Sequence, residues 1–152
     1  MSEFEKIIYT AAATIIGGLL IHAMSQLVQK LFIEPCHQYR QLNSRAISSL
    51  SFHSNMLNAK LRADDNEEYR QRYYDGQDEL RKLMADMKAQ YITITPLWLA
   101  VALRLVPSRS THRKVVRNLL TLSFFGSFSS PSDERTPYEL AKETVKLMGS
   151  EF

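Results

Sequence analysis

Four basic residues lie close together in this chain, and they are its clearest candidates for contact chemistry. They are Arg109, Arg113, Lys114 and Arg117, with no Asp or Glu between them. Arginine and lysine side chains bind carboxylates, phosphates and the anionic surface of a bilayer. The cluster therefore predicts contact with an anionic lipid or an acidic protein partner. The alternative is an ordinary solvated helix face.

Nucleic acid is the least favoured partner for this cluster. No aromatic residues alternate with the basic ones, and no nucleic-acid-binding motif surrounds them. The formal net charge of +3 is too small to indicate nucleic acid by itself.

No group of residues predicts catalysis, a metal site or a cofactor. The four histidines are scattered, at His22, His37, His53 and His112. The single Cys36 has no partner cysteine for a zinc site, and a nucleophile is seldom paired with its sequence neighbour, here His37. Hydrolase, phosphate-loop and dinucleotide-binding signatures are missing. We therefore predict a protein that is not an enzyme and has no cofactor, and the sequence indicates no small-molecule substrate.

The elements that position these residues begin with a long apolar segment. Residues 7–29 contain no Asp, Glu, Lys or Arg, and roughly 20 apolar residues in a helix cross a bilayer core. We predict a transmembrane helix over 7–31 after a short tail, 1–6. A cleaved signal peptide fits less well, because the N-terminus carries two Glu residues and no small-x-small site follows. A buried helix of a soluble domain is the stronger alternative, since polar residues enter the second half.

Basic residues near the two ends of this helix predict its orientation. Lys6 stands alone before it, whereas Lys30, Arg40 and Arg45 follow it. The positive-inside rule then predicts an N-terminus outside the cell and a cytoplasmic C-terminal domain. The lone Cys36 is consistent with a reducing compartment, and as a thiol beside a membrane helix it is a candidate for acylation.

Small residues recur at a spacing of four within the apolar helix. They are Ala13, Thr14, Gly17 and Gly18. Such residues allow two membrane helices to approach closely, so this face predicts self-association. His22 would be a buried polar contact in such an oligomer or would lie near the headgroups.

The remainder of the chain predicts an all-α domain of about four to five helices. Residues 32–37 contain Pro35 and predict a hinge at the end of the membrane helix, followed by a cytoplasmic domain over 38–152. Apolar residues at helical spacing predict a hairpin of two long helices, with the polar residues 63–68 at its turn. The helices expected for the hairpin are 38–61 and 67–90.

The second strongly apolar run, residues 91–106, is too short and too interrupted by Pro96 for a comfortable second span. We expect a buried core helix here, with a segment in the membrane interface as the alternative because of Trp98. Ser108 predicts the start of a helix running to about Phe125. Thr136, with Pro137 and Glu139 after it, predicts a last helix that ends at Gly149.

Three short motifs carry a resemblance. They are IEP at 33–35, LVPSR at 105–109 and RNLLTLSFF at 117–125. With one apolar helix before them, the chain resembles a group of small bacterial single-pass membrane proteins with a helical cytoplasmic domain and no assigned function. The resemblance implies a bacterial inner membrane and supplies no catalytic residues.

Together these patterns predict a membrane-anchored adaptor or scaffold that binds a protein partner or itself at the cytoplasmic face. The alternative is an oligomeric, membrane-perturbing or channel-forming protein, in which the first helix and residues 92–106 both enter the bilayer. A membrane-bound enzyme comes third.

Overall fold

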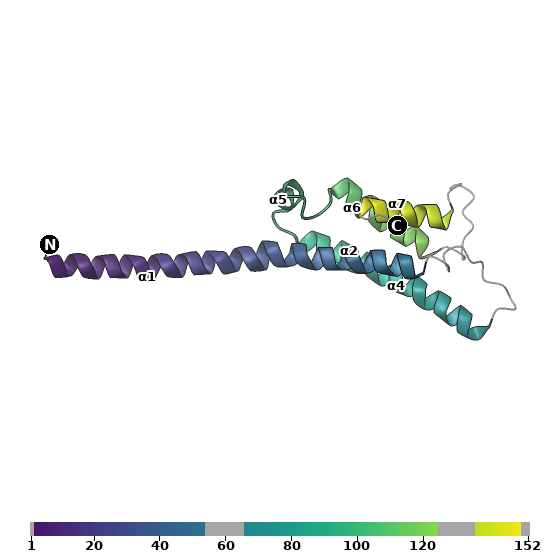
Figure 1. The fold of residues 1–152 in the computed structure, drawn as a ribbon, viewed down its shortest axis with the longest axis horizontal. Coiled ribbons are helices and arrows are strands. Elements are labelled where there is room, and N and C mark those ends of the chain that lie inside the picture. The colour runs from purple at the N-terminus through teal and green to yellow at the C-terminus, as the bar shows by residue number, and fades with distance from the viewer. Residues whose placement is uncertain (1, 54–65, 125–135, 150–152) are drawn as a thin grey trace.

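The computed structural model describes residues 2–53, 66–124 and 136–149, and every regular element in them is helical. One long N-terminal helix projects from a bundle formed by the other helices (Figure 1). The elements are α1 (Glu3–Val28), the π-helical turn η1 (Gln29–Ile33), α2 (Glu34–Phe52), α4 (Glu67–Thr93), α5 (Leu97–Ala102), α6 (Arg109–Leu122) and α7 (Pro137–Leu147). The prediction of an all-α chain is confirmed for these residues.

The first helix, α1, makes no core with the rest of the chain. Its first turn closes with a capping box, in which Ser2 Oγ accepts from the Glu5 amide and the Glu5 carboxylate accepts from the Ser2 amide. None of its residues is buried, although most are apolar. The helix is long and apolar enough to cross a membrane. The alternative expectation, a helix buried within a domain of its own chain, is wrong.

The sequence predicted that Pro35 ends or bends the first helix, and in the structure the helix does not end there. It continues from α1 through η1 into α2, and Pro35 lies in the first turn of α2. A proline here removes the hydrogen bond that the Leu31 carbonyl would accept and brings its ring against that carbonyl. The wider turn directly before it, in which the Glu34 amide donates to Gln29 O, accommodates the change without stopping the helix. Whether residues 32–37 act as a hinge stays a prediction.

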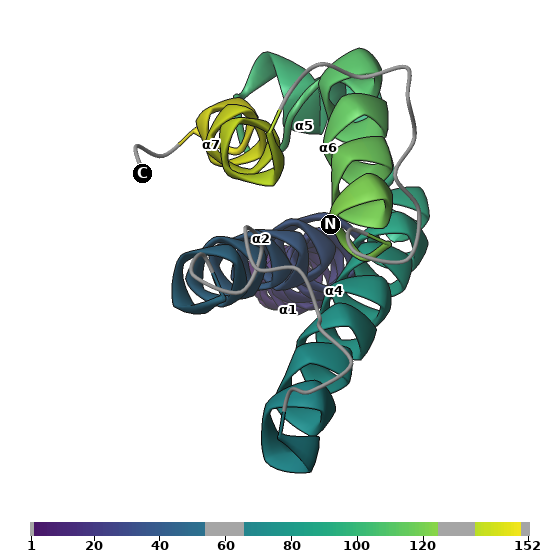
Figure 2. The ribbon, with the colours of Figure 1, turned by 90° about the vertical axis from the view of Figure 1, so that its right-hand side faces the viewer.

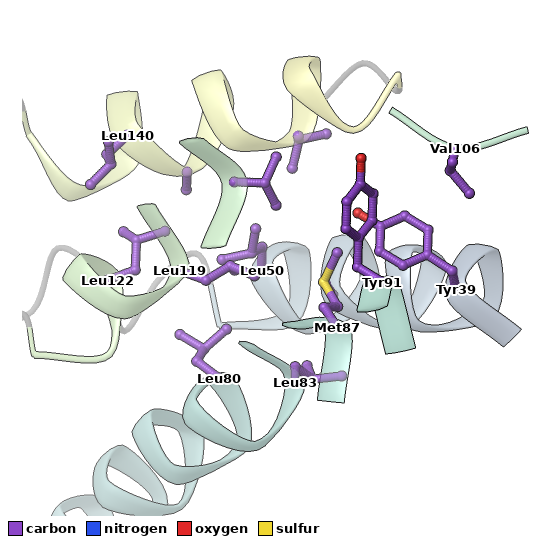
Figure 3. Close-up of a cluster of buried hydrophobic side chains, with 14 of the residues drawn as sticks. Tyr39, Leu50, Leu80, Leu83, Met87, Tyr91, Val106, Leu119, Leu122 and Leu140 are labelled. Atoms are coloured by element: carbon purple, nitrogen blue, oxygen red, sulfur yellow. The ribbon is translucent and has the colours of Figure 1, made fainter. Parts of the chain in front are cut away.

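The bundle has two layers, α2 with α4 and α6 with α7 (Figures 1 and 2). Helices α2 and α4 run antiparallel and pack through the faces whose apolar spacing predicted them. Leu57 and Leu61, predicted for the end of the first helix, lie outside the described residues. Figure 3 shows the resulting core, whose fully or almost fully buried side chains include Leu50, Leu80, Met87, Leu119, Leu122 and Val145.

The apolar run 91–106 is divided between elements and between environments. Helix α4 continues to Thr93, the Thr95–Pro96 peptide is cis, and α5 is short. Ile94, Ala100 and Val106 are buried in the core. Three large apolar side chains of the same run point outward, with exposed fractions of 75% for Ile92, 72% for Trp98 and 56% for Leu103. The prediction of a buried core helix therefore holds for only one side of this segment.

The last two helices begin where their caps predicted. Ser108 Oγ accepts from the Thr111 amide at 3.2 Å at the start of α6. At α7, Thr136 Oγ1 accepts from the Glu139 amide at 3.2 Å, and the Glu139 carboxylate accepts from the Thr136 amide at 2.9 Å. Helix α6 ends at Leu122 and α7 at Leu147, with Gly149 at a positive φ of 85° just beyond.

Candidate functional site

A groove of about 800 Å³ lies between the C-terminal end of α4, the start of α5 and one face of α6. Its wall is partly basic and partly apolar. The lining residues are Lys88, Tyr91, Ile92, Ile94, Thr95, Leu97, Arg109, His112, Arg113, Val116, Arg117 and Leu120. We call this site the basic groove.

The basic side of the groove comes mainly from one stripe of α6. Arg109, Arg113 and Arg117 are spaced four apart, so they lie on the same helix face, and Lys88 joins them from α4. All four side chains belong to exposed residues, and none forms an ion pair with another residue that the structure describes. Like charges at this spacing destabilise a helix slightly, and cations near its N-terminus oppose the dipole. Local helix stability therefore does not explain the stripe.

The floor of the groove is formed by the buried Tyr91 and His112, which belong to an aromatic cluster that ties three helices together. The His112 ring of α6 stacks on Tyr91 of α4, with ring centroids 3.8 Å apart and planes 5° apart. Tyr39 of α2 shares a 3.0 Å hydrogen bond with His112 Nδ1 and meets the Tyr91 ring edge-on at 5.5 Å. Figure 3 shows Tyr39 and Tyr91 side by side at this end of the core. The Tyr91 hydroxyl donates to Pro107 O at 2.9 Å.

The floor carries no charge at neutral pH. Burial lowers the pKa of His112 to about 4, so its imidazole is neutral in the fold. Burial also raises the pKa of Tyr91, partly opposed by the nearby Arg109 guanidinium, and burial raises that of Tyr39. The positive charge of the groove therefore comes from its rim, above a neutral floor.

Three of the four residues in the predicted basic cluster line the groove. Arg109, Arg113 and Arg117 do so, whereas Lys114 lies on α6 outside the lining residues. Lys88 and His112 were missed as members of a site. The sequence predicts that Lys88 lies on a solvated face of its helix, and no local pattern connects it with α6. A signal for His112 existed in its helical spacing from Arg109, but its stacking partner is distant in sequence.

The small-residue face of α1 is unoccupied in the single chain. A Cβ added at Gly17 or Gly18 would meet no atom within 4 Å. Ala13 and Thr14 are exposed, and the Thr14 hydroxyl donates to Thr10 O at 2.9 Å within the helix. Self-association through this face remains a prediction.

Cys36 is packed in the core rather than presented for modification. Its side chain is 3% exposed, and burial raises the pKa of the thiol. A buried neutral thiol is a poor nucleophile, so the fold does not favour the acylation considered from sequence.

Among the described residues, few groups are placed to do chemistry other than binding. No group of three His, Cys, Asp or Glu side chains is close enough there to hold a metal ion. The basic groove thus stands as the candidate binding site. No protein-family model, curated protein or solved structure matches this chain, so the assignment rests on the geometry of the groove and of α1.

Proposed function

We propose that this protein is a single-pass membrane adaptor of a bacterial inner membrane. Helix α1 anchors it with the N-terminus outside, and the cytoplasmic bundle binds a protein partner through the basic groove. The observation that carries the proposal is the combination of three arginines without ion-pair partners in the described chain and an apolar wall in one groove.

The chemistry of the groove fits an acidic, amphipathic segment of another protein. Guanidinium groups form paired hydrogen bonds with carboxylates, and the stripe from Arg109 to Arg117 spans roughly 12 Å along α6 at 1.5 Å per residue. The apolar wall, including Leu97 and Leu120, can receive apolar anchors from the same segment. Arginine and aromatic groups beside apolar surface are typical of the residues that dominate binding energy at protein interfaces.

The floor supports binding because it is already organised. Tyr39, Tyr91 and His112 are held by stacking and by hydrogen bonds to one another and to the backbone. A groove that needs little ordering loses less conformational entropy when a partner binds.

The direct test is a cross-linked pull-down of the tagged full-length protein from gently solubilised native membranes. We expect a partner at fixed stoichiometry with the wild type. The double variant Arg113→Glu/Arg117→Glu should lose it, because carboxylates in the groove repel an acidic segment.

Lys114→Glu is the matched control, since it reverses a charge on the same helix outside the groove. It should retain the partner. Retention by the double variant, or equal loss with Lys114→Glu, would contradict the assignment of the groove. Charge reversal that instead reduces binding to anionic vesicles without changing the pull-down would assign the stripe to lipid.

A second candidate function is self-association through α1, favoured by the open small-residue face at Gly17 and Gly18. A channel would require such an oligomer as its first step. A pull-down that contains the protein alone, as a homo-oligomer, would favour this candidate over the adaptor.

A further inference from the structure

We propose that the bundle makes a second contact with the bilayer through the corner where α4 meets α5. Three outward apolar side chains, Ile92, Trp98 and Leu103, define this α4–α5 corner, and the partner is the lipid surface in which α1 is anchored. The inference rests on the membrane anchoring of the proposed function. It does not require a protein partner in the basic groove.

The first argument is the height of the corner above the membrane span. The Gln90 side-chain amide donates to Pro35 O at 3.3 Å, which holds the end of α4 at the level of Pro35. At about 1.5 Å per residue, Pro35 lies roughly 9 Å beyond Gln29, the last residue of the charge-free stretch. The headgroup layer adds about 5–8 Å to each side of the hydrocarbon core.

Figure 1 shows α5 at the end of the bundle from which α1 projects. The short segment between Thr93 and Leu97 carries the chain from α4 into α5 at this end. A helix that spans the bilayer at α1 therefore brings α5 to the outer edge of the headgroup layer.

The second argument is the nature of the exposed surface. Trp98 is 72% exposed and Ile92 is 75% exposed, whereas Ala100 on the other side of α5 is fully buried. Helix α5 has no charged residue, and Trp is the side chain most typical of membrane interfaces. Water is a poor environment for this surface, and the nearest apolar phase is the bilayer that surrounds α1.

Two exposed basic residues follow the corner closely along the chain. Arg104 follows Leu103 directly and is exposed, with a positive φ of 56° that ends α5. Arg109 begins α6 a few residues later. Cations beside an inserted apolar group strengthen its attachment to an anionic leaflet. Two attachments, α1 and the corner, would fix the rotation of the bundle about α1 and hence the direction in which the basic groove opens.

Trp98 is the only tryptophan of the chain, so its own fluorescence reports on the corner. The full-length protein is placed in vesicles of phosphatidylethanolamine and phosphatidylglycerol, with or without lipids brominated on the upper acyl chain. We expect bromolipid to quench Trp98, its emission to shift to shorter wavelength, and acrylamide to quench it weakly.

Two variants in a Trp98→Phe background supply the reference values. Leu20→Trp reports on α1, and Phe52→Trp reports on the far end of α2, where the side chain is 81% exposed. Bromolipid should quench Leu20→Trp and leave Phe52→Trp almost unchanged. Trp98 should also be quenched by bromolipid, in contrast to Phe52→Trp.

If Leu20→Trp is quenched while Trp98 behaves like Phe52→Trp, the second contact is overturned and the anchor stands. If neither Leu20→Trp nor Trp98 is quenched, the anchor fails, and the corner and the membrane part of the proposed function fail with it. If Trp98 is quenched but the wild-type pull-down contains no protein partner, the contact of the corner with lipid is supported and the adaptor function is rejected.

Discussion

The two strongly apolar segments of this chain differ in what covers them. Residues 7–29 form a helix with no buried residue, whereas residues 91–106 bury Ile94, Ala100 and Val106 and expose the α4–α5 corner. Both segments are apolar enough to be driven out of water. The difference shows that apolar composition predicts that a surface will be removed from water. It does not predict whether another helix, a lipid or a second copy of the chain removes it.

The largest effect is expected from placing charged residues in α1, the apolar segment that no other helix covers. Each arginine at the centre of a membrane helix costs about 2.5–3.5 kcal/mol on insertion scales. The double variant Ile15→Arg/Leu19→Arg should therefore move the protein out of the carbonate-washed membrane pellet. Leu103→Arg, in the other apolar segment, should stay in the pellet because α1 remains intact. A pellet that retains the double variant would show that α1 is not the anchor.

The next effect compares a covered with an uncovered leucine. Leu119 is fully buried and Leu103 is 56% exposed. Leu119→Ala should reduce the free energy of unfolding by about 2–5 kcal/mol, whereas Leu103→Ala should change it by about 0.5 kcal/mol or less. The measurement is the urea concentration at which buried Cys36 becomes reactive to a thiol reagent in micelles. Equal shifts in this urea concentration for the two variants would contradict the assignment of Leu119 to the bundle core.

A smaller effect is expected from acidification at the start of the second apolar segment, where His112 stacks on Tyr91. Burial lowers the pKa of His112 from 6.5 to about 4, so between these values the unfolded chain binds a proton that the folded chain excludes. The stabilisation is complete above about pH 6.5 and is lost as the pH falls toward 4, by up to about 3 kcal/mol.

The same Cys36 assay at several pH values, limited to those at which the thiol reagent reacts with the unfolded chain, measures this loss. His112→Gln cannot titrate, so its stability should depend less on pH over that interval than the stability of the wild type. Identical slopes for the two proteins would indicate that His112 is solvated and that the floor of the groove is open.

The smallest effect on the fold is expected at the small-residue face of the first segment. Gly17→Leu/Gly18→Leu adds side chains where a Cβ meets nothing within 4 Å, so bundle stability should not change. If that face joins two copies, the oligomer should become smaller by gel filtration in detergent. Ala12→Leu, on the opposite side of α1, is the control for added bulk. An unchanged oligomer in the double variant would remove this face from consideration.

Local features of the fold were predictable because they depend on neighbouring residues. Ser108 and Thr136 cap their helices through hydrogen bonds to amides three residues away, as their positions in the sequence indicated. The apolar faces of α2 and α4 follow from helical spacing alone. At Pro35 the proline rule predicted that the helix ends or bends. The structure shows that it does not end there, because the wider π turn before the proline relieves the clash.

The basic groove was only partly predictable. The stripe of Arg109, Arg113 and Arg117 is visible as a spacing of four, and its lack of nearby acids is visible too. Lys88 and Tyr91 reach the groove because α4 packs beside α6, a contact between residues far apart in the chain. The exclusion of Lys114 likewise depends on which face of α6 turns toward α4.

The sequence by itself determined that the chain is helical, that residues 7–29 are suited to a bilayer, and that four cations gather near the start of α6. These properties follow from side-chain type and spacing within one helix. Only the tertiary structure decided that three of these cations share a groove with Lys88, that His112 is neutral, and that Trp98 points outward while Ala100 is buried. Each of these depends on burial and neighbours supplied by another helix, and helical periodicity cannot specify which side of a segment that helix will cover.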